Sequence, residues 1–315
     1  MNIPAAVQAI AGVLPRTPVL RSEALDNLAG ARLWFKAEGL QVTGSFKVRG
    51  AWNRVRSFTP EELAPGLITV SAGNAALGAA WAARAAGARL VVVMPENAVP
   101  EKLVAVAAMG ARIEKEGVTN ATQAFERLAR LRAEHGYTLV HPFDDPFVIA
   151  GAATATWELL EEVPDLDAVV VPTSGGGLFA GAILAARTAM VHGIQPFGAD
   201  GLIRSLAAGE PTPPERVQTV ADGLTAPKPG VLNFKIIREA IEQRRADAST
   251  VSDEAILEAM GLIIRHLRVI VEPAAAAGLA GILAAGEDHR FRGKKVGVVL
   301  SGSNAGMERV RSVLA

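Results

Sequence analysis

Lys47 lies in a setting that suits imine chemistry. The apolar alternating run 33–37 predicts a strand, and the segment 46–58 after it has helical spacing. Thr43 and Ser45 are good helix-capping residues, so Lys47 is expected in the first turn of that helix. The partial positive charge of a helix N-terminus favours a neutral amine or an imine over an ammonium ion. A neutral amine is what Schiff-base chemistry needs, and the alternative is a solvated lysine at a helix end.

The loop 173–178 is a second stretch with chemical potential. It lies between a predicted strand and a predicted helix, where successive backbone N–H groups and a helix N-terminus bind anions such as phosphate. Gly175, Gly177 and Ala180, with Asp200 twenty residues further on, also match a loose dinucleotide-binding pattern. Three interpretations are therefore open: a phosphate site, a nicotinamide site and a tight packing turn.

Composition and charge narrow the kinds of partner. The 315 residues include 32 basic and 32 acidic side chains with no block of one sign, which argues against nucleic acid and membrane surfaces. The window 168–186 lacks charge, but Pro172 and three consecutive glycines interrupt it, so no membrane span is expected. The absence of cysteine excludes disulfides, thiolate catalysis and zinc ribbons, and it fits a cytoplasmic protein.

Strand and helix patterns alternate along the chain. Predicted strands cover 33–37, 67–71, 89–94, 112–115, 139–141, 168–171, 195–199, 219–221 and 295–300. Predicted helices cover 46–58, 75–86, 101–109, 121–135, 146–162, 178–191, 253–267, 273–285 and 305–314. The segment 202–214 gives no clear prediction. The alternation predicts an α/β fold with mainly parallel sheets that helices cover on both faces.

Several short motifs, taken in order, resemble those of the fold-type II pyridoxal-phosphate enzymes, most closely the threonine dehydratase and serine racemase branch. The resemblance covers nearly the whole chain, and its motifs are Thr17-Pro18, Gly44 to Ala51, Ser71 to Asn74, His141-Pro142, Gly151, Pro172 to Gly177, Ala221 to Gly223, Glu272-Pro273 and Ser301 to Asn304.

The resemblance implies pyridoxal 5'-phosphate as the cofactor and assigns roles to its motifs. Lys47 would carry the cofactor as a Schiff base, Asn74 would bond the ring hydroxyl and Ser301 the pyridine nitrogen. From the residues alone, Asn74 is equally well a helix cap and Ser301 a turn serine. The implied cofactor-binding residues are Phe46, Lys47, Asn74, Ser174, Gly175, Gly176, Gly177, Leu178, Gly223 and Ser301. The implied substrate-binding residues are Ser71, Ala72, Gly73 and Ala75.

The chain departs from the family pattern on the substrate side. Dehydratases usually carry His and Gln after the asparagine, where this chain has Ala75 and Leu77, and Gln-Gly where it has Ala152-Ala153. Asp200 matches one carboxylate of the family's divalent-cation site, but a second is missing, so no metal is predicted.

The sequence predicts two domains, a small one over 65–136 and a large one formed by 1–64 and 137–315, with the active site between them. Lys47 is predicted to remove the α-proton of a β-hydroxy amino acid such as threonine or serine. Loss of the β-hydroxyl and hydrolysis of the released enamine then yield a 2-oxo acid and ammonia. A homodimer is expected.

Three other functions stay open: a racemase or another β-eliminating lyase on the same scaffold, a nicotinamide-dependent oxidoreductase, and a non-catalytic pyridoxal-phosphate binder. Elimination is expected to exceed racemisation, because related racemases place a serine where this chain has Ala72, whose methyl group cannot exchange a proton.

Overall fold

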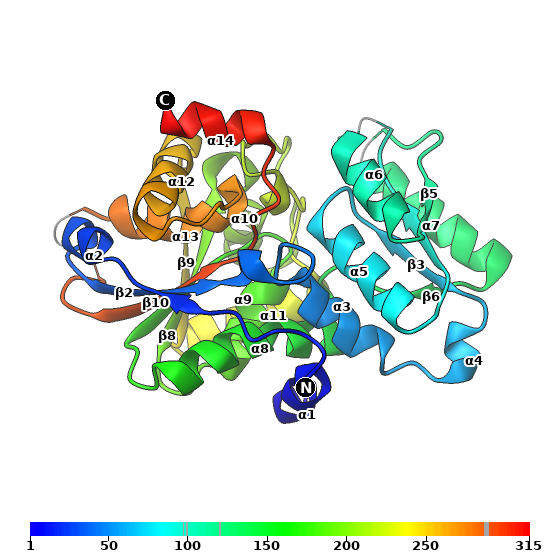
Figure 1. The fold of residues 1–315 in the computed structure, drawn as a ribbon, viewed down its shortest axis with the longest axis horizontal. Coiled ribbons are helices and arrows are strands. Elements are labelled where there is room, and N and C mark those ends of the chain that lie inside the picture. Colours follow the sequence, from blue (N-terminus) through cyan, green and yellow to red (C-terminus); the bar gives the residue numbers. More distant parts are fainter. Residues whose placement is uncertain (97, 99, 120, 287–289) are drawn as a thin grey trace. The chain divides into compact units, whose positions relative to one another are not determined.

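The computed structural model describes residues 1–96, 98, 100–119, 121–286 and 290–315. By its internal contacts the chain forms two compact units, one of Met1–Leu14 with Lys47–Gly151 and the other of Pro15–Phe46 with Ala152–Ala315. Each unit has its own sheet, and each sheet is flanked by helices (Figure 1). The predicted α/β class with mainly parallel sheets is confirmed.

The unit that includes residues 152–315 contains a six-stranded sheet with the strand order β1-β2-β10-β7-β8-β9. Its strands are β1 (Val19–Leu20), β2 (Arg32–Ala37), β7 (Ala168–Pro172), β8 (Met190–Pro196), β9 (Ala246–Val251) and β10 (Lys295–Leu300). Strand β1 is antiparallel to β2, and the other neighbouring pairs are parallel. The central strands β7 and β10 are nearly continuous apolar runs, as expected for strands buried on both faces.

Helices cover both faces of this sheet (Figure 1). One face carries α2 (Glu23–Ala29), α12 (Asp253–Leu267) and α13 (Pro273–Leu283), and the other carries α8 (Pro146–Glu162), α9 (Gly177–Ala185) and α11 (Val231–Glu242). The alanine-rich α13 approaches the sheet closely, since a Cβ on Gly278 would lie 3.1 Å from Cγ1 of Val298. Small residues on this helix therefore set the spacing of the layer.

The unit that includes residues 47–151 contains a four-stranded parallel sheet with the order β5-β4-β3-β6. Its elements are β3 (Leu67–Val70), α5 (Asn74–Ala85), β4 (Leu90–Val93), α6 (Pro100–Ala108), β5 (Arg112–Glu114), α7 (Ala121–His135) and β6 (Thr138–Leu139). Side chains alternate across the sheet: Leu67 and Val92 join the core under α5 and α6, whereas Ile68 and Val91 join the core under α7.

Helix α3 (Lys47–Val55) packs backbone against backbone on its neighbours within this unit. A Cβ added at Gly50, Gly78 or Gly151 would lie 2.7, 2.9 or 2.4 Å from backbone atoms of Val148, Lys47 and Arg49, respectively. These contacts tie α3 to α5 and to the first turns of α8. The compact unit is therefore wider than the segment 65–136, and the predicted division into domains stays a prediction.

The remaining elements are short. They are α1 (Ile3–Ile10), α4 (Pro60–Leu63), α10 (Gly201–Ala208), α14 (Met307–Leu314) and the 3-10 turns η1 (Glu38–Leu40), η2 (Phe197–Ala199) and η3 (Asp222–Leu224).

Two predicted strands were placed wrongly. Residues 195–199 span the end of β8 and the turn η2, because the strand starts earlier, at Met190. The predicted helix 178–191 accordingly stops at Ala185. Residues 219–221 form no strand, and the sheet is completed instead by β9, whose sequence Ala-Asp-Ala-Ser-Thr-Val is too polar to predict a strand.

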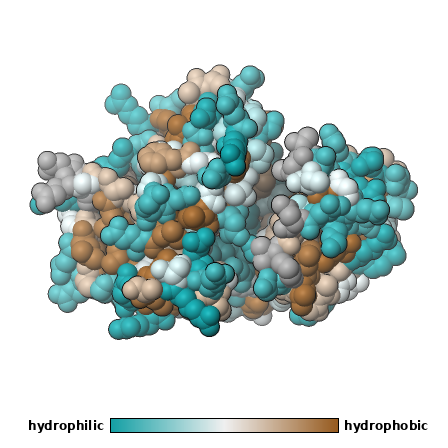
Figure 2. All heavy atoms as spheres, turned by 90° about the horizontal axis from the view of Figure 1, so that it is seen from above, coloured by the Kyte–Doolittle hydropathy of each residue, from teal (hydrophilic) through white to brown (hydrophobic). Residues whose placement is uncertain are grey.

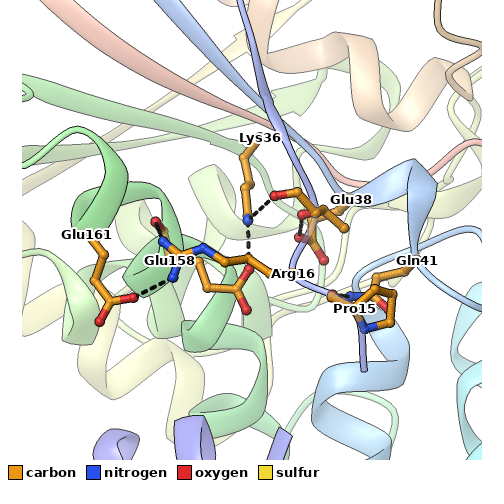
Figure 3. Close-up of polar contacts among 8 residues, drawn as sticks. Pro15, Arg16, Lys36, Glu38, Gln41, Glu158 and Glu161 are labelled. Atoms are coloured by element: carbon orange, nitrogen blue, oxygen red, sulfur yellow. Dashed lines mark hydrogen bonds and ion pairs between the residues drawn. The ribbon is translucent and has the colours of Figure 1, made fainter. Parts of the chain in front are cut away.

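A buried ion pair holds the start of the six-stranded unit together (Figure 3). Lys36 of β2 is fully buried, and its Nζ donates to Oε2 of Glu158 on α8 at 2.6 Å and to the carbonyl oxygen of Thr17 at 2.7 Å. The hydroxyl of Thr17 donates to Oε1 of buried Glu38 at 2.5 Å. Arg16 adds a bond from Nη2 to the Glu158 carbonyl oxygen at 2.8 Å. Strand β2, the segment before β1 and helix α8 are thereby linked.

We predict that Glu158→Gln destabilises the protein by about 3 kcal/mol, because it removes the carboxylate that pairs with the buried Lys36 ammonium at 2.6 Å. Urea unfolding followed by circular dichroism measures the change. Glu242→Gln is the matched control, since Glu242 pairs with Arg238 on the surface of α11 and should change stability by less than about 1 kcal/mol. Equal losses in the two variants would contradict a special role of the buried pair.

No helix among the described residues has the length and apolar character to cross a membrane. On the face seen in Figure 2, hydrophilic and apolar residues are interspersed.

Candidate active site

Lys47 is the first residue of α3, so the expected position in the first turn of a helix is confirmed. The prediction that Thr43 and Ser45 cap this helix is wrong, because their hydroxyls are buried and make no hydrogen bond. Ser45 instead forms an isolated antiparallel bridge with Gly302. The segment just before α3 is thus anchored to Gly302 by this bridge, with Phe46 as a turn residue between the bridge and the helix.

The amine of Lys47 meets a backbone carbonyl. Its Nζ donates to the oxygen of Pro142 at 3.1 Å and lies 6.0 Å from the ring centre of Phe143. Asn74 and Gly78 are one turn apart on the same face of α5, and Gly78 contacts the Lys47 backbone. The packing of α3 on α5 therefore brings the predicted Lys47 and Asn74 to the same region of this unit.

The predicted substrate loop precedes α5. The hydroxyl of Ser71 accepts from the backbone N–H of Gly73 at 3.1 Å, and Gly73, with no side chain to cap the helix, is the N-cap. Asn74 is therefore the first helical residue and not the cap that was one interpretation of it. Ala72 and Ala75 lie beside these residues, half-buried. The uncapped N-terminus of α5 suits a carboxylate.

Lys102 is a neighbour of this loop that sequence reasoning missed. Its Nζ lies 4.0 Å from the place that a Cβ on Gly73 would take. Lys102 belongs to α6, whose spacing resembles that of any amphipathic helix, so no sequence signal pointed to it. An ammonium group here adds to the attraction that the helix N-terminus exerts on an anion.

The glycine loop lies between β7 and α9, as predicted. Two groups of the loop accept hydrogen bonds from the segment 226–233. Ser174 Oγ accepts from the N–H of Ala226 at 2.9 Å. The Gly175 carbonyl accepts from the N–H of Gly230 at 3.0 Å and from Nδ2 of Asn233 at 2.8 Å. Gly176 is the N-cap of α9, so no side chain caps this helix. Its first N–H groups, from Gly177 and Leu178 onward, fit a phosphate.

Gly176 also has a structural reason to be glycine. Its φ is +90°, and a Cβ would lie 2.9 Å from Cβ of Asn233 and 3.1 Å from Cδ1 of Ile237 on α11. The packing-turn and anion-site interpretations are therefore compatible at this residue.

Ser301 follows the end of β10, in the same unit as the glycine loop. It is 4% exposed, its carbonyl accepts from the N–H of Phe46 at 3.0 Å, and none of the described residues hydrogen-bonds its hydroxyl. A buried hydroxyl of this kind fits a pyridine nitrogen, which needs a donor.

Glu272 is a second residue whose place the sequence did not predict. Its Oε1 lies 2.5 Å from the position of a Cβ on Gly302 and 3.6 Å from that of a Cβ on Gly223. The side chain is buried, and its backbone N–H donates to the carbonyl of Gly302 at 3.0 Å. Gly223, a predicted cofactor-binding residue, and Gly302, which follows Ser301 in the chain, are thus neighbours of one buried carboxylate.

Asp200 has a cationic partner, since its Oδ1 accepts from Nε of Arg204 at 2.8 Å. Within the described part of the chain no group of three or more His, Cys, Asp or Glu residues could hold a metal ion.

The glycine loop yields a prediction about Gly176→Ala, which combines a strained φ with a close contact. We expect it to lower the unfolding free energy by about 2 kcal/mol or more. Gly209→Ala is the control, because its φ is +79° and a Cβ would meet nothing within 4 Å, which leaves the strain alone, about 1 kcal/mol. Thermal unfolding compares the two, and equal losses would show that the contact with α11 contributes nothing.

The family model described as pyridoxal-phosphate dependent enzyme matches residues 10–302. The chain is 39% identical to L-threo-3-hydroxyaspartate ammonia-lyase of Saccharomyces cerevisiae, over 95% of this chain and 91% of the relative. It is 34% identical to L-threonine ammonia-lyase of Thermotoga maritima, over 99% of this chain and 77% of the relative. The crystal structure of serine racemase from Dictyostelium discoideum matches with a TM-score of 0.88 and 37% identity. The match covers 96% of this chain and 97% of that chain.

Proposed function

The chain belongs to the family of pyridoxal-phosphate dependent enzymes, and we propose that it is an ammonia-lyase that converts a β-hydroxy amino acid to a 2-oxo acid and ammonia. The observation that carries the proposal is the position of Lys47, at the start of α3 with its amine on the Pro142 carbonyl. Similarity to two ammonia-lyases over most of their length supports the reaction class. Family membership also favours pyridoxal phosphate over the nicotinamide alternative.

The residues described above fit the cofactor. We propose that the N–H groups from Ser174 to Leu178 bind its phosphate, that Ser301 donates to its ring nitrogen and that Asn74 bonds its ring hydroxyl. The bound cofactor supplies an electron sink for charge that develops at the substrate Cα. Because Ser301 is neutral, it leaves the ring a weaker sink than an aspartate partner would, which suits elimination, where charge leaves with the β-substituent.

Lys47 would carry the cofactor and then act as the base. Its free amine would take the α-proton and would then give a proton to the β-hydroxyl, which would leave as water. The released enamine hydrolyses to the 2-oxo acid and ammonia. A hydrogen bond from Nζ to Pro142 holds the amine in one direction between these steps, which is the gain that positioning provides.

The substrate carboxylate would bind at the loop of Ser71 and Gly73. The N-terminus of α5 and the ammonium group of Lys102 both attract an anion there. Ala72 and Ala75 add no polar group, so the loop binds the carboxylate through its backbone and the hydroxyl of Ser71. A cytoplasmic location, which the lack of cysteine favours, and a homodimer complete the proposal.

The alternative function is that of an amino-acid racemase, and the similarity to a serine racemase supports it. Racemisation needs a second proton donor on the face of the substrate opposite Lys47. Ala72 stands where the resemblance places that donor, and a methyl group cannot supply a proton. Elimination is therefore the proposed main reaction.

A substrate panel tests the proposed function. Purified protein should form 2-oxo acid from at least one of threonine, serine and threo-3-hydroxyaspartate, and borohydride should fix the cofactor to Lys47. Lys47→Ala should lower the rate at least about a thousandfold, because both the attachment point and the base are lost. Glu242→Gln, on the surface of α11, is the control. Failure with every substrate, or fixation to another lysine, would refute the proposal.

Ala72→Ser tests the choice between elimination and racemisation. In the unmodified protein, formation of the enantiomer should be less than about a hundredth of 2-oxo acid formation, because a proton donor that is not held in place loses much of its effect. The serine variant should raise this ratio about tenfold or more. Chiral separation of the products measures both, and comparable rates in the unmodified protein would contradict the argument from Ala72.

A further inference from the structure

We propose that His141 is a positioning residue for Lys47: its imidazole ring holds the turn that presents a hydrogen-bond acceptor to the Lys47 amine. The inference rests on the proposed function, in which Lys47 carries the cofactor and moves the α-proton.

The ring of His141 closes a tight turn. His141 comes shortly after β6, and its Nδ1 accepts from the backbone N–H of Asp144 at 2.8 Å and from that of Phe143 at 3.3 Å. Asn and Asp side chains make the same kind of bond when they accept from N–H groups two and three residues ahead. The imidazole therefore replaces an Asx side chain at the start of this turn.

The turn carries two groups that contact Lys47. The Pro142 carbonyl accepts from Nζ at 3.1 Å, and the Phe143 ring lies 6.0 Å from Nζ, close enough for a cation–π attraction. Proline fixes the φ of residue 142, and Phe143 packs edge-on against the His141 ring with 4.9 Å between ring centres. His141 thus orders the carbonyl and the aromatic ring together.

The chemistry of Lys47 explains why an ordered acceptor matters. An amine that takes a proton becomes an ammonium ion with three N–H donors, and it can rotate about its flexible stem. One fixed acceptor restricts that rotation and keeps the proton near the carbon from which it came. A carbonyl oxygen suits this role better than a carboxylate, because it orients the group without a full negative charge to stabilise the ammonium form permanently.

The turn requires a neutral ring. A nitrogen that accepts from two N–H groups carries no proton, so the proton of neutral His141 lies on Nε2. Burial lowers the pKa of His141 below its usual range, and the positive charge of Lys47 lowers it further, while Asp144 and Asp145 oppose the shift. The ring therefore stays unprotonated at neutral pH, where the turn is needed.

Two variants separate the accepting atom from the ring. Asn Oδ1 and His Nδ1 are both bonded to Cγ, so His141→Asn places an acceptor at the same point, whereas His141→Leu places a methyl group there. Both variants lose the ring contacts with Phe143 and Phe125. A difference between them therefore reports on the hydrogen bonds of the turn and not on stacking.

The test uses protein stripped of cofactor and reloaded with pyridoxal phosphate at neutral pH, with attachment followed by absorbance. We expect His141→Leu to slow attachment and to lower kcat by about tenfold with KM changed less than about twofold. His141→Asn should stay within about threefold of the unmodified protein on both measures. If the leucine variant does not fold, His141→Gln, whose acceptor lies one bond too far, replaces it and should show the same loss.

Attachment and kcat at the unmodified level in a folded leucine or glutamine variant would overturn the proposal, as would an asparagine variant that loses as much as the leucine one. Borohydride fixation and peptide mapping of the unmodified protein distinguish this failure from failure of the proposed function. Cofactor on a different lysine refutes the role of Lys47 itself. Cofactor on Lys47 with equal rates in all variants refutes the role of His141 alone.

Discussion

The close packing of helix α3 is the constraint on which the Lys47 side of the candidate site depends. Glycines at 50, 78 and 151 leave no room for a Cβ, so α3 meets α5 and α8 along the backbone. Packing without side chains leaves little freedom to slide or tilt, because any shift meets hard backbone atoms. These three contacts therefore fix the start of α3, where Lys47 lies, against α5, which begins with Asn74. Two of these glycines belong to motifs that first suggested the family, and the structure explains them as packing.

In the six-stranded unit, the order of the strands places the glycine loop and Ser301 at one edge of the sheet. Strands β7 and β10 are parallel neighbours with Val298 opposite Val170, so the glycine loop and Ser301 emerge from the same carboxyl edge. Ligands bind at that edge in open α/β sheets because helix N-termini and loops converge there. Glu272 and Gly223 come to it from other elements, and the missing side chains of Gly223 and Gly302 give the carboxylate its space.

Two lysines of this chain illustrate how environment decides chemistry. Lys36 is fully buried and donates to the carboxylate of Glu158, and the opposite charge stabilises its ammonium form. The Nζ of Lys47 donates to the neutral carbonyl of Pro142, at a helix start where the backbone disfavours a cation. The first arrangement keeps a charge and joins structural elements. The second places an amine against a neutral acceptor at the start of a helix, where the proposed reaction uses it.

The sequence by itself determined the elements whose signals are local. Strand β10 and helices α7, α8 and α12 were predicted to the residue. The signals lie within each segment: an apolar run in β10, helical spacing in the three helices, and a proline at the first position of α8. Strand β9 escaped prediction, since a polar edge strand becomes a strand only by pairing with β8. The same holds for His141 and Glu272. Their motifs were visible, but Lys47 meets Pro142 across 95 residues of sequence, and only the packed backbone decides which carbonyl, ring or carboxylate reaches a given side chain.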